Sequence, residues 1–251
     1  MTFSCAAVLF DLDGTLMNHD AASDAAVVAT LLATARPEAE PEPEQVIRWW
    51  RELEAPAIDR YLAGEVTFQE QRRLRVTGLA QRCGLGRWPD DRADAWFARY
   101  LERYEAEWHA YPDALPALRA LTTHPDRPLL GVVTNGDADQ QWRKIAQVGL
   151  ADWLPHVTTS SQAGSAKPEP TIFYTACAAL QVNPARVVYV GDRLGTDAEA
   201  ATAAGLHGVW LDRHGSRPSR TLTVPRIESL NELPAVIDGL SSAGGETSFR
   251  T

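Results

Sequence analysis

The sequence predicts an α/β protein with a doubly wound parallel sheet and a helical domain inserted after its first strand. Short apolar runs at 6–10, 128–133, 187–190 and 206–211 have the length and composition of buried strands. Helical patterns separate the last three runs, and such alternation is typical of a parallel sheet. Residues 17–108 contain helical patterns but no strand-like run, which indicates a separate helical domain.

The predicted domains are an α/β core from residues 1–16 and 109–240, a helical domain from 17–108, and a disordered tail at 241–251. With 251 residues and 45% hydrophobic content, the chain can bury the cores of such domains. A Pro- and Glu-rich stretch at 36–44 suits a loop within the helical domain. The tail is small and polar, a composition that is typical of disorder.

A pair of carboxylates follows the first strand. Residues 11–16 read Asp-Leu-Asp-Gly-Thr-Leu, so Asp11 and Asp13 stand two positions apart where a buried strand should end. Carboxylates beside a core destabilise the fold unless they are paired, hydrogen-bonded or bound to a cation. The carboxyl end of a strand in an open α/β sheet is also where ligands bind. An ordinary Asp/Gly turn would explain the same residues, so the clusters that follow decide between these readings.

The helical domain is rich in aromatic residues. It contains five of the chain's eight tryptophans. Trp96, Tyr100 and Tyr104 recur at helical spacing, which places their rings on one face of a helix. We therefore expect most of these aromatic side chains to form the core of this domain.

Potential anion-binding groups follow the second strand. Thr134, Asn135 and Gly136 supply a hydroxyl, an amide and a flexible turn, although an ordinary turn would use the same residues. A helix is expected at 139–148. Further along, Lys167 is the lone lysine in a stretch otherwise supplied with arginine, and it offers a compact positive charge. A solvated loop lysine is the alternative.

Two more acids follow the third strand, at Asp192 and Asp197. Thr196 is expected to cap a helix that runs to Gly205, so Asp197 could simply be an acid favoured in the first turn of that helix. No helix has begun at Asp192, and this explanation does not extend to it. Another helix is predicted at 171–180.

The net charge and the cysteine content limit the kinds of binding partner and the cellular compartment that the sequence predicts. The net charge of -9 disfavours nucleic-acid polymers and anionic membranes as main partners. The three cysteines are scattered and form no C-x-x-C pair, which favours a reducing cytoplasm over a disulfide framework or a zinc site. No run is long enough to cross a bilayer. The oligomeric state cannot be read from these features.

The order of these motifs resembles the haloacid-dehalogenase-like hydrolase superfamily, whose members carry DxDGT, a Thr or Ser, a Lys, and GDxxxxD. The corresponding residues here begin at Asp11, Thr134, Lys167 and Gly191. Gln141, Lys144 and the Gly149-Leu150 pair further resemble the branch that contains small-molecule phosphatases and nucleotidases. The resemblance implies a Rossmann-like core, a helical cap that selects the substrate, and hydrolysis of a small phosphorylated metabolite.

The resemblance also implies roles for individual residues. Asp11 would be the nucleophile that forms an aspartyl phosphate, and Asp13 would be the general acid and then the general base. Mg2+ would be held by the carboxylates of Asp11 and Asp192 and by the backbone carbonyl of Asp13. These oxygen ligands suit a hard divalent cation.

The phosphoryl group would be bound by a second set of residues. Thr134 and nearby backbone amides would hydrogen-bond its oxygens, Asn135 would be a further phosphate-binding residue, and Lys167 would offset their charge. Asp197 would orient Lys167 or a metal-bound water.

Several alternatives stay open at this point. A phosphomutase is the closest enzymatic alternative. A dehalogenase is weaker, because dehalogenases of this superfamily resemble one another in lacking the aspartate found here as Asp13. A protein that binds a phosphorylated ligand without turning it over would also retain the fold.

Overall fold

The chain folds into two compact units, one made of Met1–Asn18 with His109–Thr251 and the other made of His19–Trp108. The computed structural model describes residues 3–34, 41–216 and 221–243. The first unit is an α/β unit and the second is entirely helical in its described residues.

The first boundary lies two residues later than the predicted end of the first core segment at residue 16. Met17 forms isolated β-bridges with Asp13 and with Ala110. The backbone N–H of Asn18 donates to the carbonyl of His109, at 3.0 Å. These bonds hold residues 17 and 18 against the α/β unit, so the helical unit begins at His19.

The α/β unit is built on a six-stranded sheet in which every neighbouring pair is parallel. The strand order is β3-β2-β1-β4-β5-β6, so the chain extends one way from β1 and then crosses back to extend the other way. This reversal confirms the predicted doubly wound architecture. The strands are β1 (Ala7–Phe10), β2 (Leu129–Thr134), β3 (His156–Thr159), β4 (Val187–Gly191), β5 (His207–Leu211) and β6 (Arg226–Ile227).

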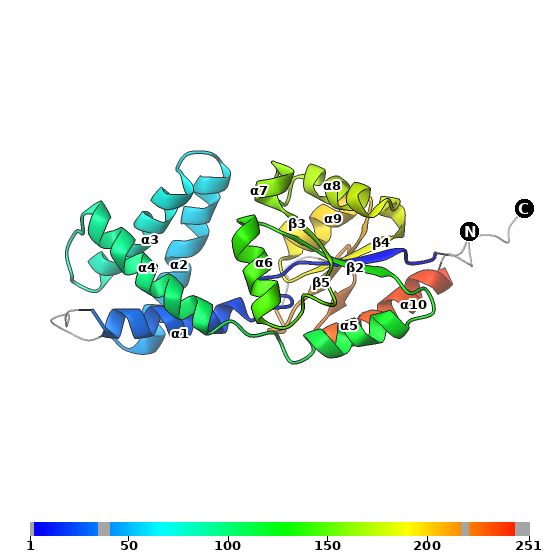
Figure 1. The fold of residues 1–251 in the computed structure, drawn as a ribbon, viewed down its shortest axis with the longest axis horizontal. Helices are drawn as coiled ribbons and strands as arrows, with labels where there is room; N and C mark the ends of the chain where they lie inside the picture. Colours follow the sequence, from blue (N-terminus) through cyan, green and yellow to red (C-terminus); the bar gives the residue numbers. More distant parts are fainter. Residues whose placement is uncertain (1–2, 35–40, 217–220, 244–251) are drawn as a thin grey trace, which may run out of the picture. The chain divides into compact units, whose positions relative to one another are not determined.

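Helices lie on both faces of this sheet. Figure 1 shows α8 and α9 on one side and α5 and α10 on the other. The α-helices of this unit are α5 (Ala114–Thr123), α6 (Ala138–Gln147), α7 (Ser160–Ala163), α8 (Pro170–Leu180), α9 (Ala200–Ala203) and α10 (Leu233–Ala243). Three shorter turns complete it: the 3-10 turns η1 (Pro184–Arg186) and η3 (Leu230–Glu232), and the π-helical turn η2 (Leu194–Glu199).

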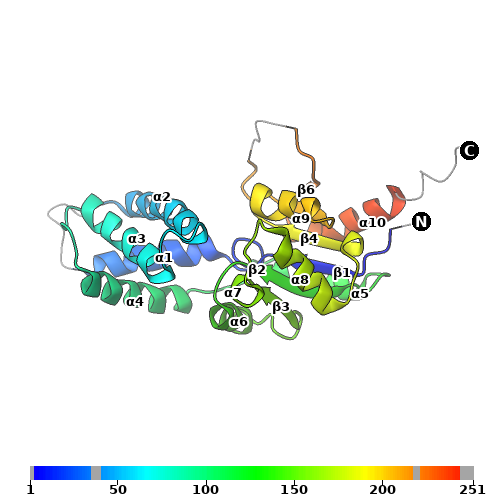
Figure 2. The ribbon, with the colours of Figure 1, turned by 90° about the horizontal axis from the view of Figure 1, so that it is seen from above.

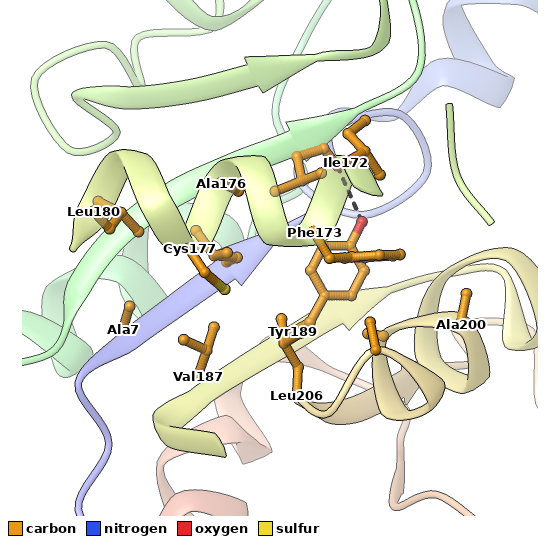
Figure 3. Packing of buried hydrophobic residues seen from close by; sticks show 14 residues of the cluster. Ala7, Ile172, Phe173, Ala176, Cys177, Leu180, Val187, Tyr189, Ala200 and Leu206 are labelled. Carbon is orange, nitrogen blue, oxygen red and sulfur yellow. Dashed lines mark hydrogen bonds between the residues drawn. The ribbon is translucent and has the colours of Figure 1, made fainter. Parts of the chain in front are cut away.

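The face under α8 and α9 carries a continuous hydrophobic core (Figure 3). Phe173 of α8 meets the ring of Tyr189 of β4 edge to face, with ring centroids 5.1 Å apart. Both side chains are fully buried. The buried members of this cluster are Ala7, Leu9, Val133, Ile172, Phe173, Ala176, Cys177, Leu180, Val187, Tyr189, Ala200, Ala201, Ala204 and Leu206.

Four of the six strands match the predicted apolar runs to within one residue at each end. The other two were not predicted. The sequence of β3 is His-Val-Thr-Thr. Because β3 lies at an edge of the sheet, it is paired with another strand on one side only and its side chains need not all be apolar. The two-residue β6 is too short to give any pattern.

The predicted helix after β4 begins earlier than expected. The turn η2 starts at Leu194, so Thr196 lies inside it and does not act as its N-cap. Helix α10 continues to Ala243, so the first three residues of the predicted tail are helical. Residues 244–251 lie outside the described residues.

The helical unit consists of α1 (His19–Leu32), α2 (Pro43–Leu62), α3 (Phe68–Arg82) and α4 (Asp90–Ala106), seen together in Figure 2. Helix α1 packs against α4, and α2 packs against α3. Of the predicted loop at 36–44, residues 36–40 lie outside the described residues, and α2 already begins at Pro43.

Aromatic residues fill the core of this unit, as the sequence predicted. Trp96, Tyr100 and Tyr104 are buried along one face of α4, and the planes of neighbouring rings lie within 8° of parallel. Trp50 contacts both Trp96 and Tyr100. Among the described residues, no helix of either unit has the length and apolar character needed to span a bilayer.

Candidate active site

The site lies where the central strands of the sheet end. In the register of the sheet, Phe10 at the end of β1 is opposite Val132 of β2 and Val190 of β4. Asp11 and Asp192, which follow β1 and β4, therefore emerge side by side. These residues and the end of β2 meet at the point where the winding of the sheet reverses, the usual place for a ligand in this class of fold.

Lys167 forms the centre of this cluster. Its ammonium group donates to Asp11 Oδ1 at 2.6 Å, to Asp197 Oδ1 at 2.7 Å and to the hydroxyl of Tyr189 at 2.9 Å. Its side chain is only 3% exposed. The structure therefore excludes the solvated loop lysine that the sequence left open.

Asp197 is held from two directions. Its Oδ1 accepts from Lys167, and its Oδ2 accepts from the backbone N–H of Arg193 at 3.0 Å. The side chain is 1% exposed. It therefore serves as a fixed negative partner for Lys167, rather than as an exposed acid in the first turn of a helix.

Burial and charge shift the pKa values of the cluster in a consistent way. Burial raises the pKa of Asp11 to about 6, although the charge of Lys167 lowers it. Burial, followed by the charges of Asp11 and Asp197, raises the pKa of Asp192 to about 8. Burial lowers the pKa of Lys167, but the charges of Asp11 and Asp197 outweigh this effect and raise it. The cluster thus contains more carboxylate charge than Lys167 alone can neutralise.

The same carboxylates could hold a metal ion. Asp11, Asp192 and Asp197 each offer an oxygen, and these oxygens all lie within 4.8 Å of one another. Asp192 Oδ1 is buried and has no hydrogen-bond partner among the residues that the structure describes. A buried carboxylate oxygen without a partner destabilises the protein unless a cation binds there. An oxygen-only donor set of this kind fits a hard divalent cation.

Gly14 allows the first loop to approach Asp192 closely. It adopts a positive φ of 87°, and a Cβ at this position would lie 2.5 Å from Asp192 Oδ2. Any larger residue would displace that carboxylate. Glycine is therefore required at position 14 for two reasons: the backbone has a positive φ, and there is no space for a side chain beside Asp192.

The carboxylate of Asp13 faces helix α6 instead of joining the other acids. Lys144 Nζ lies 2.7 Å from both of its oxygens, and Gln141 Nε2 lies 3.2 Å from Oδ2. Gln141 Nε2 also donates to Thr134 Oγ1, at 2.8 Å. Asp13 and Thr134, which belong to different motifs, are thus connected through one helix.

Asn135 holds the backbone of Lys167. Its Nδ2 donates to the carbonyl of Lys167 at 2.9 Å, and its Oδ1 accepts from the backbone N–H of Lys167 at 2.8 Å. The amide side chain is thus used to position the lysine. Phosphate binding through the backbone at this position stays a prediction.

The structure brings Asp11, Asp192, Asp197 and Lys167 into one cluster and links Asp13 to Thr134 through Gln141, but several contacts were not predicted. Tyr189 was treated only as part of a strand, and no role was given to Gln141 or Lys144. One signal was available, because only two of the chain's 24 basic residues are lysines, Lys144 and Lys167. Both are buried against carboxylates of the site.

Comparison with known proteins gives phosphatases among the curated relatives, and both phosphatases and haloacid dehalogenases among the solved structures. A glyceraldehyde 3-phosphate phosphatase of Methanopyrus kandleri is 40% identical over 103 residues, and the match spans 41% of this chain and 43% of that protein. A phosphoserine phosphatase of Thermus thermophilus is 32% identical over 73% of this chain and 71% of that protein. The magnesium-bound HAD hydrolase YfnB of Bacillus subtilis has the same fold, with a TM-score of 0.77 at 21% identity over 94% of this chain and 99% of that chain.

The family assignment rests on a family model and on the Thermus relative. The haloacid dehalogenase-like hydrolase family matches residues 5–205, which include every motif residue of the site. The Thermus protein independently matches more than two thirds of both chains. The chain belongs to the haloacid dehalogenase-like hydrolase family.

Proposed function

We propose that the protein is a Mg2+-dependent phosphatase that hydrolyses a small phosphorylated metabolite through an aspartyl-phosphate intermediate. One observation carries the proposal: Asp11 is buried at a strand end, is held by Lys167, and lies beside Asp192, which has an oxygen without a partner. The family assignment and the phosphatase names of the two relatives support it. The presence of Asp13 favours phosphate ester hydrolysis over dehalogenation.

Asp11 is the proposed nucleophile. One of its oxygens attacks phosphorus, the bond between phosphorus and the ester oxygen breaks, and the electron pair stays on the leaving oxygen. Lys167 already fixes Oδ1 of Asp11 at 2.6 Å, so attack through Oδ2 requires little reorientation of the side chain. The product of this step is an aspartyl phosphate and an alcohol.

Asp13 is the proposed acid and base. It gives a proton to the leaving oxygen in the first step. In the second step it takes a proton from a water that attacks phosphorus, the bond to Asp11 breaks, and inorganic phosphate is released. Asp11 is then a carboxylate again and Asp13 is again protonated, so the cycle closes.

The acid cluster fits Mg2+ in chemistry and in charge. The carboxylates of Asp11 and Asp192 and the backbone carbonyl of Asp13 would hold the ion. Once bound, it would neutralise the phosphate dianion that otherwise repels the carboxylate of Asp11. The unpartnered oxygen of Asp192 supports this arrangement.

The phosphoryl oxygens would be bound by groups from the ends of β2 and the loop before α8. Thr134 and the backbone amide of Asn135 would donate to them, and Lys167 would offset their charge. Asp197 would keep Lys167 in place, and the 2.7 Å contact between them supports this role.

The helical unit, predicted at residues 17–108, is assigned the role of a cap that selects the substrate. This assignment rests on the family resemblance and on the insertion of the unit directly after the first motif. We place the substrate among small phosphorylated metabolites. The cytoplasmic location expected from the cysteine pattern stays a prediction.

The proposal is tested with purified protein and p-nitrophenyl phosphate. We expect release of p-nitrophenol and inorganic phosphate with Mg2+, loss of release in EDTA, and loss by at least about a thousandfold in Asp11→Asn, because the nucleophile is gone. Asp152→Asn, which changes an exposed acid of the same unit, is the matched control. Full activity of Asp11→Asn would refute the mechanism.

A panel of phosphorylated metabolites then identifies the substrate. Calorimetry distinguishes turnover from binding alone. Tight binding of a phosphorylated metabolite without release of phosphate would show that the protein is a binding module.

A further inference from the structure

Helix α6 supplies two side chains, those of Lys144 and Gln141, that contact the carboxylate of Asp13. Lys144 Nζ lies at 2.7 Å from each carboxylate oxygen of Asp13, and Gln141 Nε2 adds a contact of 3.2 Å to Oδ2. Both oxygens of Asp13 are thereby bound, and its side chain is still 26% exposed. The carboxylate is thus fixed in orientation while it remains accessible.

The local sequence explains why both side chains point inward. Gln141 and Lys144 are three residues apart, and this spacing puts them on one face of α6. They are 1% and 4% exposed, whereas Trp142 and Arg143 between them are exposed. The helix begins at a defined point, because Asp137 caps it through the N–H of Gln140.

The backbone before the helix leaves little freedom to Gln141. Gly136 has a φ of 148°, and a Cβ at this position would lie 3.1 Å from Gln141 Nε2. The amide nitrogen has two hydrogens and lies within hydrogen-bond distance of three acceptors, Thr134 Oγ1, the carbonyl of Asn135 and Asp13 Oδ2. It therefore links Asp13 to the end of β2.

A lysine here is unusual for this chain. The protein uses arginine for nearly all its basic residues, and the other lysine, Lys167, binds Asp11. An ammonium group is a compact charge that can sit equally close to two oxygens of one carboxylate. Burying such a charge destabilises the fold unless the charge is paired, and Asp13 provides this pairing for Lys144.

We propose that Lys144 and Gln141 are positioning residues that hold the carboxylate of Asp13 in the orientation it needs for proton transfer. The inference rests on the proposed function, since it gives Asp13 the role of acid and base. Neither residue is placed in contact with the substrate. Both act through Asp13, and Gln141 also sets its distance from Thr134.

The test compares leaving groups that differ in their need for a proton. Glycerol phosphate must be protonated as it leaves, whereas p-nitrophenolate is a stable anion that leaves without an acid. In Lys144→Met we expect the first-turnover rate with glycerol phosphate to fall by about ten- to a hundredfold, less than the roughly 10²–10⁴-fold that general acid catalysis supplies, because Asp13 itself is retained. The first-turnover burst of p-nitrophenol should change by less than about threefold, because formation of the phosphoenzyme from this ester needs no acid.

The second half of the cycle gives an independent readout. Hydrolysis of the phosphoenzyme needs Asp13 as a base whichever ester was used. In Lys144→Met, steady-state turnover of p-nitrophenyl phosphate should therefore fall, and acid quenching should trap more phosphoenzyme than in the wild type. A residue that only supports the fold would slow both steps alike.

Three variants serve as companions. Lys144→Arg keeps the charge and should restore part of the ratio between the two esters. Gln141→Leu should change the ratio of the first-turnover rates with the two esters in the same direction as Lys144→Met does. If Lys144→Met does not fold, Gln141→Leu tests the inference in its place. Arg143→Met removes a positive charge from the exposed side of the same helix and should leave the ratio unchanged.

An unchanged ratio of the first-turnover rates with the two esters in both Lys144→Met and Gln141→Leu would overturn the inference, as would equal loss of the first-turnover rate with both esters. These results are distinguishable from failure of the proposed function. In that case wild-type protein would release no phosphate from either ester, or Asp11→Asn would release it as fast as the wild type does.

Discussion

Tyr189 shows how one hydroxyl group connects the core to the active site. Its ring belongs to the hydrophobic cluster under α8 (Figure 3). Its hydroxyl accepts from Lys167 Nζ at 2.9 Å. The hydroxyl has one proton to give, and both the carbonyl of Val133 at 3.0 Å and Asp197 Oδ1 at 3.2 Å can accept it. Burial, together with the charge of Asp197, keeps its pKa well above the ordinary value. Tyr189 therefore remains a neutral donor beside a charged lysine.

Removing that hydroxyl should weaken both stability and catalysis. Tyr189→Phe keeps the ring against Phe173 but leaves a buried ammonium group with one partner fewer, so we expect the free energy of unfolding to fall by about 1–3 kcal/mol. Urea denaturation measures this change. Tyr174→Phe on α8, where the side chain is 47% exposed, is the control and should change the free energy by less than about 0.5 kcal/mol. Equal stability of the two variants would contradict the role given to Tyr189.

At the residue scale, the sequence identified the acids and Lys167, and it missed the roles of Tyr189, Gln141 and Lys144 in holding them. Asp11, Asp13 and Asp192 were predictable because charges beside apolar runs are rare and need a reason. Tyr189 was not, because a tyrosine within an apolar strand is compatible with simple packing. Its function depends on the neighbouring strand β2 and on Lys167, and no local pattern encodes these long-range contacts.

Among the elements near the site, β5 and η2 approach each other closely at Gly208. A Cβ on Gly208 of β5 would lie 1.9 Å from the carbonyl oxygen of Ala198 in η2. The missing side chain lets η2 lie directly on the strand. This packing places Asp197, the residue before Ala198, so that its Oδ1 lies 2.7 Å from Lys167 Nζ.

Filling that space should therefore disturb both packing and the site. Gly208→Ala must push η2 away from β5, and we expect it to lower the free energy of unfolding by about 1–3 kcal/mol, the usual range for overpacking. Thermal or urea unfolding measures this. Gly239→Ala in α10 is the matched control, because a Cβ there meets nothing within 4 Å, and it should instead stabilise the helix by about 0.5–1 kcal/mol. The interpretation fails if the two variants shift stability in the same direction.

At the scale of elements, predictability followed the hydrophobic pattern. Helices cover the strands β1, β2, β4 and β5, so these strands are apolar. Their positions could therefore be predicted from the sequence. The edge strand β3 carries the polar pattern of a surface segment. The start of η2 at Leu194 was not predicted, because the packing of η2 against β5 sets where it begins. Thr196 has the side chain of a typical N-cap residue, but it lies inside η2 and does not cap it.

For the whole molecule, the acid cluster links folding to pH and to Mg2+. Asp192 has a pKa of about 8 in the folded chain against 3.8 as the ordinary value, and burial is the main cause. Between these two values the folded state binds more protons than the unfolded state. The stability that this proton uptake provides is fully present below about pH 4 and is lost as the pH rises through about 8. Asp11, with a pKa of about 6, adds a contribution of the same sign.

Mg2+ should therefore stabilise the protein more at pH 8 than at pH 5, because protons compete with the cation for the same oxygens. At 100 times its dissociation constant, a ligand adds about 2.7 kcal/mol to the free energy of unfolding. For a chain of this size this raises Tm by roughly 5–10 °C. Calorimetric scans at both pH values, with Mg2+ or with EDTA, measure the difference. Asp192→Asn should abolish most of the Mg2+ effect and flatten the pH dependence in EDTA, whereas Asp152→Asn should change neither. A Mg2+ shift of the same size at both pH values, or one that survives in Asp192→Asn, would show that the cation binds elsewhere.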